Sequence, residues 1–425
     1  MRTIRLAVPI VGVVLVILAQ RLSAQEAPAV DSVLARLTAE ALAANPALGA
    51  DRALARAATA RVRPAGALPD PMLSFGVMNL TLPRFAFRES DFTEVDVELS
   101  QEFPWPGTLG ARTRAARAEA RASEADAAAR KRDVVVRTAE LYYRLRYVMT
   151  ARGTLERQRA LLATGVAIST ARYATTTAPQ NDPLQARVAL ARLDTEEADL
   201  TAEEAELRAE LTALRNVSGT DSLPIEPIRP MEVLPLRIHA PAALPPDSLA
   251  GHPRVLARQA TVEAADQNAR VEALGARPDF TFMTRYGARP LGADFFSAFV
   301  GVRIPLYGGR KQSRQAEAAR AEADAARASL AEEQASLAAE LRRTLAQVRS
   351  GEARLRLLVE RVVPAADATT QATLRSYRVG RIEFLTVLAA EDALYRAQLD
   401  AARVAAEHLT HLVMLEQLLG REGPS

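Results

Sequence analysis

The sequence predicts a mainly α-helical protein with a small β part, in which a β-hairpin followed by very long helices occurs twice. Three observations support this prediction: an internal duplication, helical stretches without proline, and four short segments in which apolar and polar residues alternate. Helices of this length do not fit inside a compact domain, so the pattern favours an elongated molecule.

The N-terminal segment 1–24 has the features of a secretory signal peptide. Arg2 and Arg5 precede an unbroken apolar stretch over residues 6–19, and a small residue, Ala24, stands at the expected cleavage position. The stretch has about 14 apolar residues, fewer than the roughly 20 that a membrane-spanning helix needs. We therefore expect the chain to be exported and cleaved near residue 24.

Composition excludes several classes of protein. The whole chain has a formal net charge of +3, and removal of the signal peptide takes away three arginines and no acid, which leaves a mature chain near neutrality. A neutral chain offers no electrostatic argument for binding nucleic acid. The absence of cysteine excludes disulfides, thiolate metal sites and a lipid-bearing N-terminal cysteine.

Two repeats, 25–215 and 252–425, are joined by a proline-rich linker, 216–251. Matched points in the two repeats lie 201–209 residues apart. They are Leu68-Pro69-Asp70 with Arg277-Pro278-Asp279, Phe103-Pro104-Trp105-Pro106-Gly107 with Ile304-Pro305-Leu306-Tyr307-Gly308, and Tyr173 with Tyr377. A unit that occurs only twice argues against a solenoid of many short repeats.

Long helical hairpins are predicted over residues 107–215 and 308–419. Residues 107–178 contain no proline and are rich in alanine, arginine, glutamate and leucine, which favour helix. Some 70 helical residues would extend on the order of 100 Å.

Coiled-coil seams are predicted on the helices of the second repeat. Leu341, Val348, Leu355 and Val362 keep a seven-residue spacing. A second set fits steps of three and four if Asp392 is a polar break within it: Leu385, Leu388, Tyr395, Leu399 and Ala402. An ordinary helical bundle would explain these seams equally well.

Strands are expected at about 71–79, 92–103, 279–286 and 295–305. The second of these alternates almost without error: Val95, Val97, Leu99 and Phe103 on one face, Glu94, Asp96, Glu98, Ser100 and Glu102 on the other. Such alternation is typical of transmembrane β-strands, with one face toward lipid and one toward water. Two half-buried hairpins of a soluble protein are the alternative.

Four strands cannot close a barrel, and open sheet edges are not tolerated in hydrocarbon, so several chains must contribute. Eight strands would leave an interior filled by side chains, and a conducting pore therefore favours three chains and twelve strands. We expect the lumen to be lined by Glu94, Asp96, Glu98 and Glu102, with Arg285 and Arg303 neutralising part of the field.

No catalytic or cofactor site is expected. The sequence has no phosphate-binding glycine loop, nucleophile elbow or His-Glu zinc motif. His408 and His411 are spaced to share a metal ion, but such a pair more often lies on a solvated helix face, so we expect no metal site.

The most specific motif is the segment Ser376-Tyr377-Arg378-Val379-Gly380-Arg381, which is followed by Leu385 and Val387-Leu388. Its first-repeat copy runs from Arg172-Tyr173 to Asn181-Asp182-Pro183-Leu184, with Thr176 at the position of the glycine. Together with the signal peptide and the duplication, these segments resemble the TolC-like outer-membrane efflux protein family over nearly the whole mature chain.

The resemblance implies a homotrimer in the outer membrane, with a 12-stranded β-barrel continuous with a periplasmic α-helical coiled-coil tunnel. It implies a passive exit duct in a tripartite efflux system, which works with a periplasmic adaptor (membrane fusion) protein and an inner-membrane pump of the RND type. It places adaptor docking and gating at the helix turns, here Tyr173, Thr176, Asp182, Tyr377, Gly380, Arg381 and Thr386. Asp182 fits the acidic ring of the family, whereas Thr386 replaces its acidic counterpart.

Two further segments resemble the heavy-metal-efflux branch of that family, Leu68-Pro69-Asp70-Pro71 and Gln101-Glu102-Phe103-Pro104-Trp105-Pro106-Gly107. This resemblance implies heavy-metal cations as the substrate, and drugs or other small molecules are the next alternative. A periplasmic coiled-coil scaffold or adaptor without a pore remains the alternative to a channel.

Overall fold

The computed structural model describes residues 31–80, 83, 88, 90–175, 181–219, 224–234 and 249–420. The predicted signal peptide 1–24, Thr176 and residues 220–223 and 235–248 of the predicted linker lie outside the described residues.

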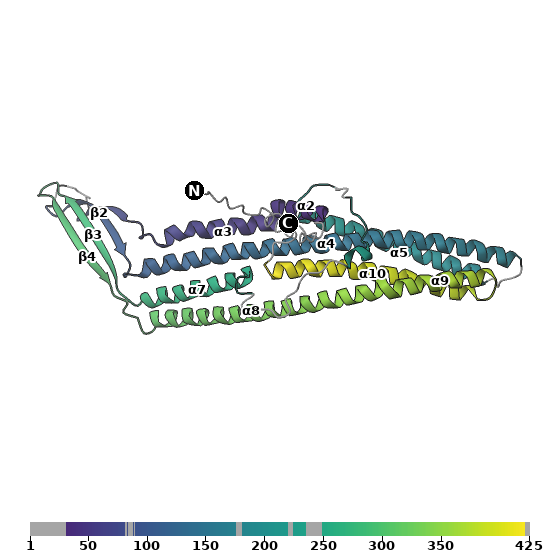
Figure 1. The fold of residues 1–425 in the computed structure, drawn as a ribbon. Coiled ribbons are helices and arrows are strands. Elements are labelled where there is room, and N and C mark those ends of the chain that lie inside the picture. The colour runs from purple at the N-terminus through teal and green to yellow at the C-terminus, as the bar shows by residue number, and fades with distance from the viewer. Residues whose placement is uncertain are drawn as a thin grey trace, which may run out of the picture.

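The molecule is long and narrow, with a β-sheet at one end and helices that run side by side along its length (Figure 1). The predicted class, mainly helical with four strands, is confirmed. One helix, α4 (Thr108–Ala174), has 67 residues, which corresponds to roughly 100 Å. The same length in the second repeat is covered by α8 (Gln312–Leu357), a π-helical turn η1 (Leu358–Val362) and α9 (Val363–Arg378).

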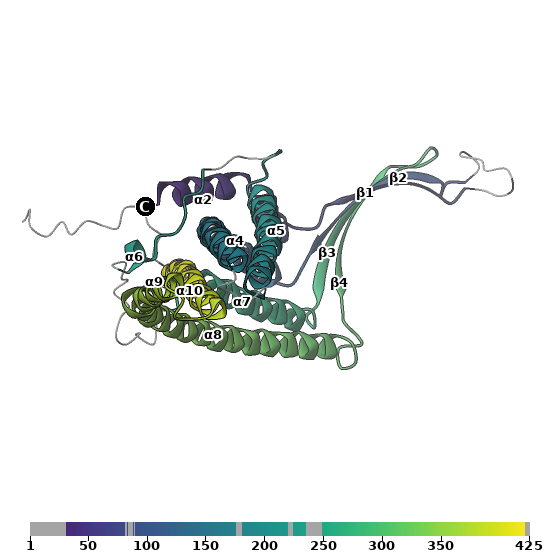
Figure 2. The same ribbon diagram turned by 90° about the vertical axis from the view of Figure 1, so that its right-hand side faces the viewer.

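Shorter helices lie in line along these two long ones. In the first repeat, α3 (Pro46–Ala65) and α5 (Asn181–Leu214) run alongside α4. In the second, α7 (Pro253–Leu274) and α10 (Phe384–Leu418) run alongside α8 (Figure 1). Two short helices, α2 (Ser32–Ala44) and α6 (Pro230–Val233), lie at the side of the bundle in the end-on view (Figure 2).

A single side chain joins α3 to α5. The Asn45 side-chain oxygen accepts the Leu48 backbone N–H at 3.0 Å and so caps α3, while its Nδ2 donates to the Leu214 carbonyl, also at 3.0 Å, at the end of α5. Both helix ends have backbone groups without an intrahelical partner, and Asn45 satisfies one of each.

The π-helical turn has a local cause in Pro364. This residue is the second of α9, two positions after the end of η1. Proline has no N–H to donate to the preceding turn and its ring crowds the carbonyl there, so the helix widens locally. The first-repeat helix α4 contains no proline and continues without interruption.

The sheet unites the two repeats. Its strands β1 (Met72–Met78), β2 (Glu94–Phe103), β3 (Asp279–Ala288) and β4 (Phe295–Arg303) are antiparallel and lie in sequence order. Pairing of β2 with β3 connects one repeat to the other. None of the helices within the described ranges has the length and hydrophobicity needed to cross a bilayer.

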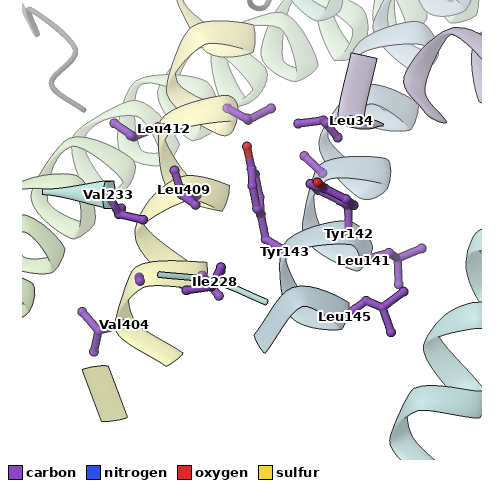
Figure 3. Close-up of a cluster of buried hydrophobic side chains, with 14 of the residues drawn as sticks. Leu34, Leu141, Tyr142, Tyr143, Leu145, Ile228, Val233, Val404, Leu409 and Leu412 are labelled. Atoms are coloured by element: carbon purple, nitrogen blue, oxygen red, sulfur yellow. The ribbon is translucent and has the colours of Figure 1, made fainter. Parts of the chain in front are cut away.

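The main hydrophobic core lies at mid-length, where α2, α4, α10 and the segment 224–234 meet (Figure 3). Tyr143 of α4 is almost fully buried there. Beside it, the Tyr142 hydroxyl donates to the Asp31 carboxylate at 2.8 Å, and Arg146 pairs with the same carboxylate at 3.0 Å. The Ile228 N–H donates to Thr150 Oγ1 at 2.8 Å, which fixes the described part of the linker on α4.

The seam predicted on α8 is confirmed in its first three positions. Leu341, Val348 and Leu355 are buried, whereas Val362 is exposed. The π-helical turn lies between Leu355 and Pro364 and changes the angular phase of the helix, so the seven-residue spacing ends there.

The seam predicted on α10 is wrong at its start. Leu385 is exposed and Asp392 lies on the surface, where it pairs with Arg396 at 3.0 Å. The buried positions precede these by one residue: Phe384, Val387, Glu391 and Leu394. Both sets follow steps of three and four. Each contains one acidic residue, Glu391 or Asp392, so the sequence did not favour either set.

Replacement of Asn45 by alanine should destabilise the helical bundle. The variant loses the α3 cap and the bond to the end of α5, a cost of about 1–3 kcal/mol. The midpoint of thermal unfolding, followed by the helical circular dichroism signal in detergent, should fall by several degrees. Gln334→Ala on the exposed face of α8 should leave the midpoint unchanged, and equal midpoints for both variants would contradict the role given to Asn45.

Candidate functional site

The sheet has one apolar and one polar face, as the alternation predicts. Val95, Val97 and Leu99 are exposed on one face. The strand register sets the other face, which we call the polar face: Glu94, Asp96, Glu98, Ser100 and Glu102 of β2 with Asp279, Thr281, Met283, Arg285 and Gly287 of β3. All six predicted lumen residues lie on this one face.

Arginines compensate most of the acids on the polar face. Arg285 contacts Glu94 at 2.5 Å and Asp96 at 3.4 Å, and Arg289, which the sequence analysis missed, contacts Glu94 at 3.7 Å. Toward the helices, Arg303 contacts Glu102 at 2.7 Å and Asp279 at 3.6 Å. The pairing follows from the register, which the sequence alone does not give.

Glu98 differs from its neighbours on β2. It forms no ion pair with any described residue of the chain, although its register partner is Arg285. Arg285 instead turns toward Glu94 and Asp96. Among the described residues, five carboxylates, including that of Asp279, therefore face three guanidinium groups, which gives this part of the polar face a net negative charge.

Gly76 leaves space for the Asp96 carboxylate. A β-carbon on Gly76 would lie 2.5 Å from Asp96 Oδ1, closer than real atoms approach. The register puts these two residues side by side on β1 and β2. The small residue thus lets the carboxylate lean over the neighbouring strand, next to Arg285.

The far end of the helices holds the second predicted site. Tyr377 of α9 is buried and its hydroxyl lies 3.4 Å from Asp182 Oδ2 at the start of α5. Burial, and next the nearby Asp182 carboxylate, raise the pKa of Tyr377, so its hydroxyl stays protonated and acts as a donor. Arg172 of α4 donates to the Tyr377 carbonyl at 3.0 Å and stacks over its ring at 4.7 Å.

A small apolar cluster supports this contact. The Tyr377 and Phe384 rings lie 5.3 Å apart in a tilted arrangement, and the Phe384 ring packs on Gly165 of α4, where a β-carbon would lie 3.2 Å from two ring atoms. The sequence prediction named neither Arg172 as a contact residue nor Phe384 and Gly165. The contact between Gly165 and Phe384 joins distant parts of the chain, so no local signal in the sequence indicated it.

The remaining predicted tip residues that the structure describes lie on the surface. Gly380 ends α9 with a φ of 75°, and the Gly380 and Arg381 N–H groups donate to the carbonyls of Tyr377 and Ser376 at 2.9 and 3.0 Å. This is a Schellman-type end, which favours glycine. Arg381 and Thr386 are exposed. Tyr173 is 45% exposed, so the two repeats differ here.

Glu391 is a buried acidic residue that the sequence analysis did not predict. Its side chain occupies the buried seam of α10 between Val387 and Leu394 and is 2% exposed. Its Oε2 atom has no hydrogen-bond partner among the described residues. Burial raises the pKa of Glu391 to about 7, because a low-dielectric surrounding disfavours the charged form.

A pH dependence of stability follows from Glu391. The folded state binds the proton more tightly than the unfolded chain, so this stabilisation is complete below the ordinary pKa of 4.5 and is lost as the pH rises through about 7. The unfolding midpoint of the wild type should fall between pH 5 and pH 8, on the order of 5 °C.

Glu391→Gln removes this titration and should flatten the profile. Asp392→Asn, at the neighbouring exposed position, is the matched control and should keep the wild-type slope. A Glu391→Gln profile that is as steep as that of the wild type would show that another group titrates.

No group of three or more histidine, aspartate or glutamate side chains is arranged to hold a metal ion in the described ranges. His408 does not lie on a solvated helix face, as was expected of the pair with His411. It is buried against Gly351 of α8, where a β-carbon would lie 3.1 Å from its Nδ1.

Comparison with known proteins agrees with this architecture. The model of the family "Outer membrane efflux protein" matches residues 37–220 and 244–421. No curated protein sequence matches the chain.

Several solved structures share the fold. CusC is 17% identical, with a TM-score of 0.82, over 92% of this chain and 93% of that one. The outer-membrane channel OprN is 19% identical, with a TM-score of 0.80, over 92% and 91%. The outer membrane protein VceC from Vibrio cholerae is 19% identical, with a TM-score of 0.75, over 92% and 97%.

A four-stranded sheet with one polar face stands at the end of a long helical bundle, and this fold is shared with the solved structures. The chain belongs to the outer membrane efflux protein family. Its place is the outer membrane, from which the helices extend into the periplasm.

Proposed function

We propose that the chain, as a homotrimer, is the passive exit duct of a tripartite efflux system. An inner-membrane pump, of the RND type, supplies the energy, and a periplasmic adaptor protein connects the pump to the duct. The observation that carries this proposal is the polar face of the sheet, which stands at the end of helices that extend roughly 100 Å. Three chains would place three polar faces around one lumen.

The tip supports a docking and gating role. Tyr377, Asp182 and Arg172 hold α9 against α4 and α5 by a few polar contacts at the very end of the helices. A contact of this size can be opened by an adaptor at modest cost, unlike the large core at mid-length. Exposed Tyr173, Arg381 and Thr386 would then lie where an adaptor reaches them.

Heavy-metal cations are the proposed substrate. The support is the residual negative charge of the polar face, together with Glu98, which has no ion pair among the described residues. Rings of carboxylates favour cations in a pore. The pairing with arginine makes this field weaker than the sequence suggested, so we expect moderate cation preference rather than a selectivity filter.

Planar bilayers test the duct directly. Purified trimers should give single-channel currents, whereas a periplasmic scaffold without a pore would give none. Absence of currents from trimers that insert into the bilayer would support the scaffold instead.

Glu98→Gln should lower the permeability of cations relative to anions. The variant removes the one carboxylate of β2 that no described arginine neutralises, and we expect a decrease of about twofold. Reversal potentials under a potassium chloride gradient measure this ratio. Glu98→Asp keeps the charge and should keep the ratio, and an unchanged ratio in Glu98→Gln would place Glu98 outside the conduction path.

Asp182→Ala should raise the conductance of the closed channel or weaken its block by cations. The variant removes the acceptor of the Tyr377 hydroxyl. Asp194→Ala is the control, because Asp194 is an exposed acid on the same helix and its partner Arg159 keeps Glu197 at 2.7 Å. Equal conductance and block in both variants would limit Asp182 to a structural role in the first turn of α5.

A further inference from the structure

The turn from β4 into α8 carries an exposed apolar pair next to exposed cations. Leu306 is 83% exposed and Tyr307 is 74% exposed, among the largest values for apolar residues in the described chain. Arg310 and Lys311 follow after two glycines, and both are exposed. Figure 1 shows this turn at the foot of the sheet, where the strands end and the helices begin.

Backbone hydrogen bonds hold the turn in a defined shape. The N–H groups of Arg310 and Lys311 both donate to the Tyr307 carbonyl at 2.9 Å, and the Ser313 N–H donates to the Gly308 carbonyl at 2.9 Å. The apolar pair and the two cations are therefore presented together rather than on a freely moving segment.

In the equivalent turn of the first repeat, the aromatic residue makes contacts within the chain. The Trp105 ring stacks on Phe280 at 6.0 Å and receives Arg277 over its face at 5.9 Å. The Trp105 backbone N–H donates to Asp279 Oδ1 at 2.9 Å. Trp105 of the first repeat is thus covered by Arg277 and Phe280, which belong to the second repeat.

The two cations of the second-repeat turn have no comparable contacts within the described ranges. Arg310 and Lys311 form no ion pair with any described residue, whereas Arg314, one turn further, pairs with Glu317 at 2.5 Å. Unpaired adjacent cations at an exposed turn create a local positive potential.

The turn continues the apolar face of β4. Phe296, Val300 and Val302 are exposed on that face, and Ile304 and Leu306 extend it beyond the strand. In an outer-membrane protein this face meets lipid, and its end toward the helices meets the inner leaflet. Tyrosine is favoured at this depth, and arginine and lysine there reach the headgroups.

We propose that the turn 304–311 is a binding site for anionic phospholipid headgroups of the inner leaflet. Leu306 enters the acyl region, Tyr307 lies at the interface, and Arg310 and Lys311 bind the headgroup phosphate. The site exists once per chain, because the first-repeat turn is occupied by its own contacts. This proposal rests on the outer-membrane location and is independent of what the protein exports.

The test compares two double variants of the full-length trimer in detergent. Arg310→Gln with Lys311→Gln removes the cations of the turn. Arg342→Gln with Arg343→Gln removes an adjacent exposed pair on the same helix, roughly 50 Å further from the membrane. Binding of phosphatidylglycerol and phosphatidylcholine is measured by native mass spectrometry, with inorganic phosphate as competitor.

We expect the first variant to bind phosphatidylglycerol about 25-fold more weakly, at roughly fivefold per cation. Its binding of phosphatidylcholine should be unchanged, and the second variant should behave like the wild type. Equal binding by both variants would overturn the proposal, as would displacement of the lipid by inorganic phosphate. Dissociation of the first variant into monomers would also overturn it, because the turn would then be a subunit contact.

If the Arg310→Gln, Lys311→Gln variant loses lipid binding but keeps normal single-channel currents, the headgroup site is supported and the proposed duct is unaffected. Absence of currents with normal lipid binding would contradict the duct and leave the headgroup site standing.

Discussion

The outer edges of β1 and β4 set the constraint on which the assembly depends. Within the described chain each of these strands has a neighbour on one side only. Their remaining backbone N–H and carbonyl groups would lie in hydrocarbon, where no water can satisfy them, at a cost of several kcal/mol for each group. Strands from other copies of the chain are the natural partners, and closure of the sheet would bring the polar faces together around one lumen.

This constraint also positions the helices. Each repeat leads from its hairpin directly into a long helix, so the order of strands around a closed sheet determines the order of helices below it. The pairing of β2 with β3 already places the two repeats side by side, with α4 against both α7 and α10. Asn45 and the mid-length core then keep the in-line helices in register.

The two repeats differ at their far ends. In the second repeat Tyr377 is buried, Gly380 forms the helix end, and Pro364 introduces a π-helical turn. In the first, α4 is regular and Tyr173 is exposed. Glu391, buried without compensation near the same end, adds a local source of instability. A tip held by few polar contacts below a large apolar core is consistent with movement at one end of a rigid body.

The features that could be predicted from the sequence depend on local periodicity. The alternation at Glu94–Phe103 gave the strand and its faces, and the absence of proline gave α4. Features that depend on contacts between distant segments could not be predicted. The start of the α10 seam differs by one residue from the prediction, since both phases fit the spacing and only tertiary packing selects Glu391 over Asp392, whereas the predicted Tyr395, Leu399 and Ala402 are buried. The pairing of Arg285 with Glu94 and Asp96 depends on strand register, and the contact between Tyr377 and Asp182 joins residues 195 positions apart.

Cross-linking of the two edge strands tests the central claim most directly. The chain contains no cysteine, so single cysteines placed along β1 and β4, such as Phe75→Cys with Val300→Cys and neighbouring pairs, report only engineered contacts. Oxidation in outer membranes should give dimers and trimers for pairs in register, and no species larger than a trimer. Monomers alone for every pair along both strands would contradict closure of the sheet by other copies of the chain.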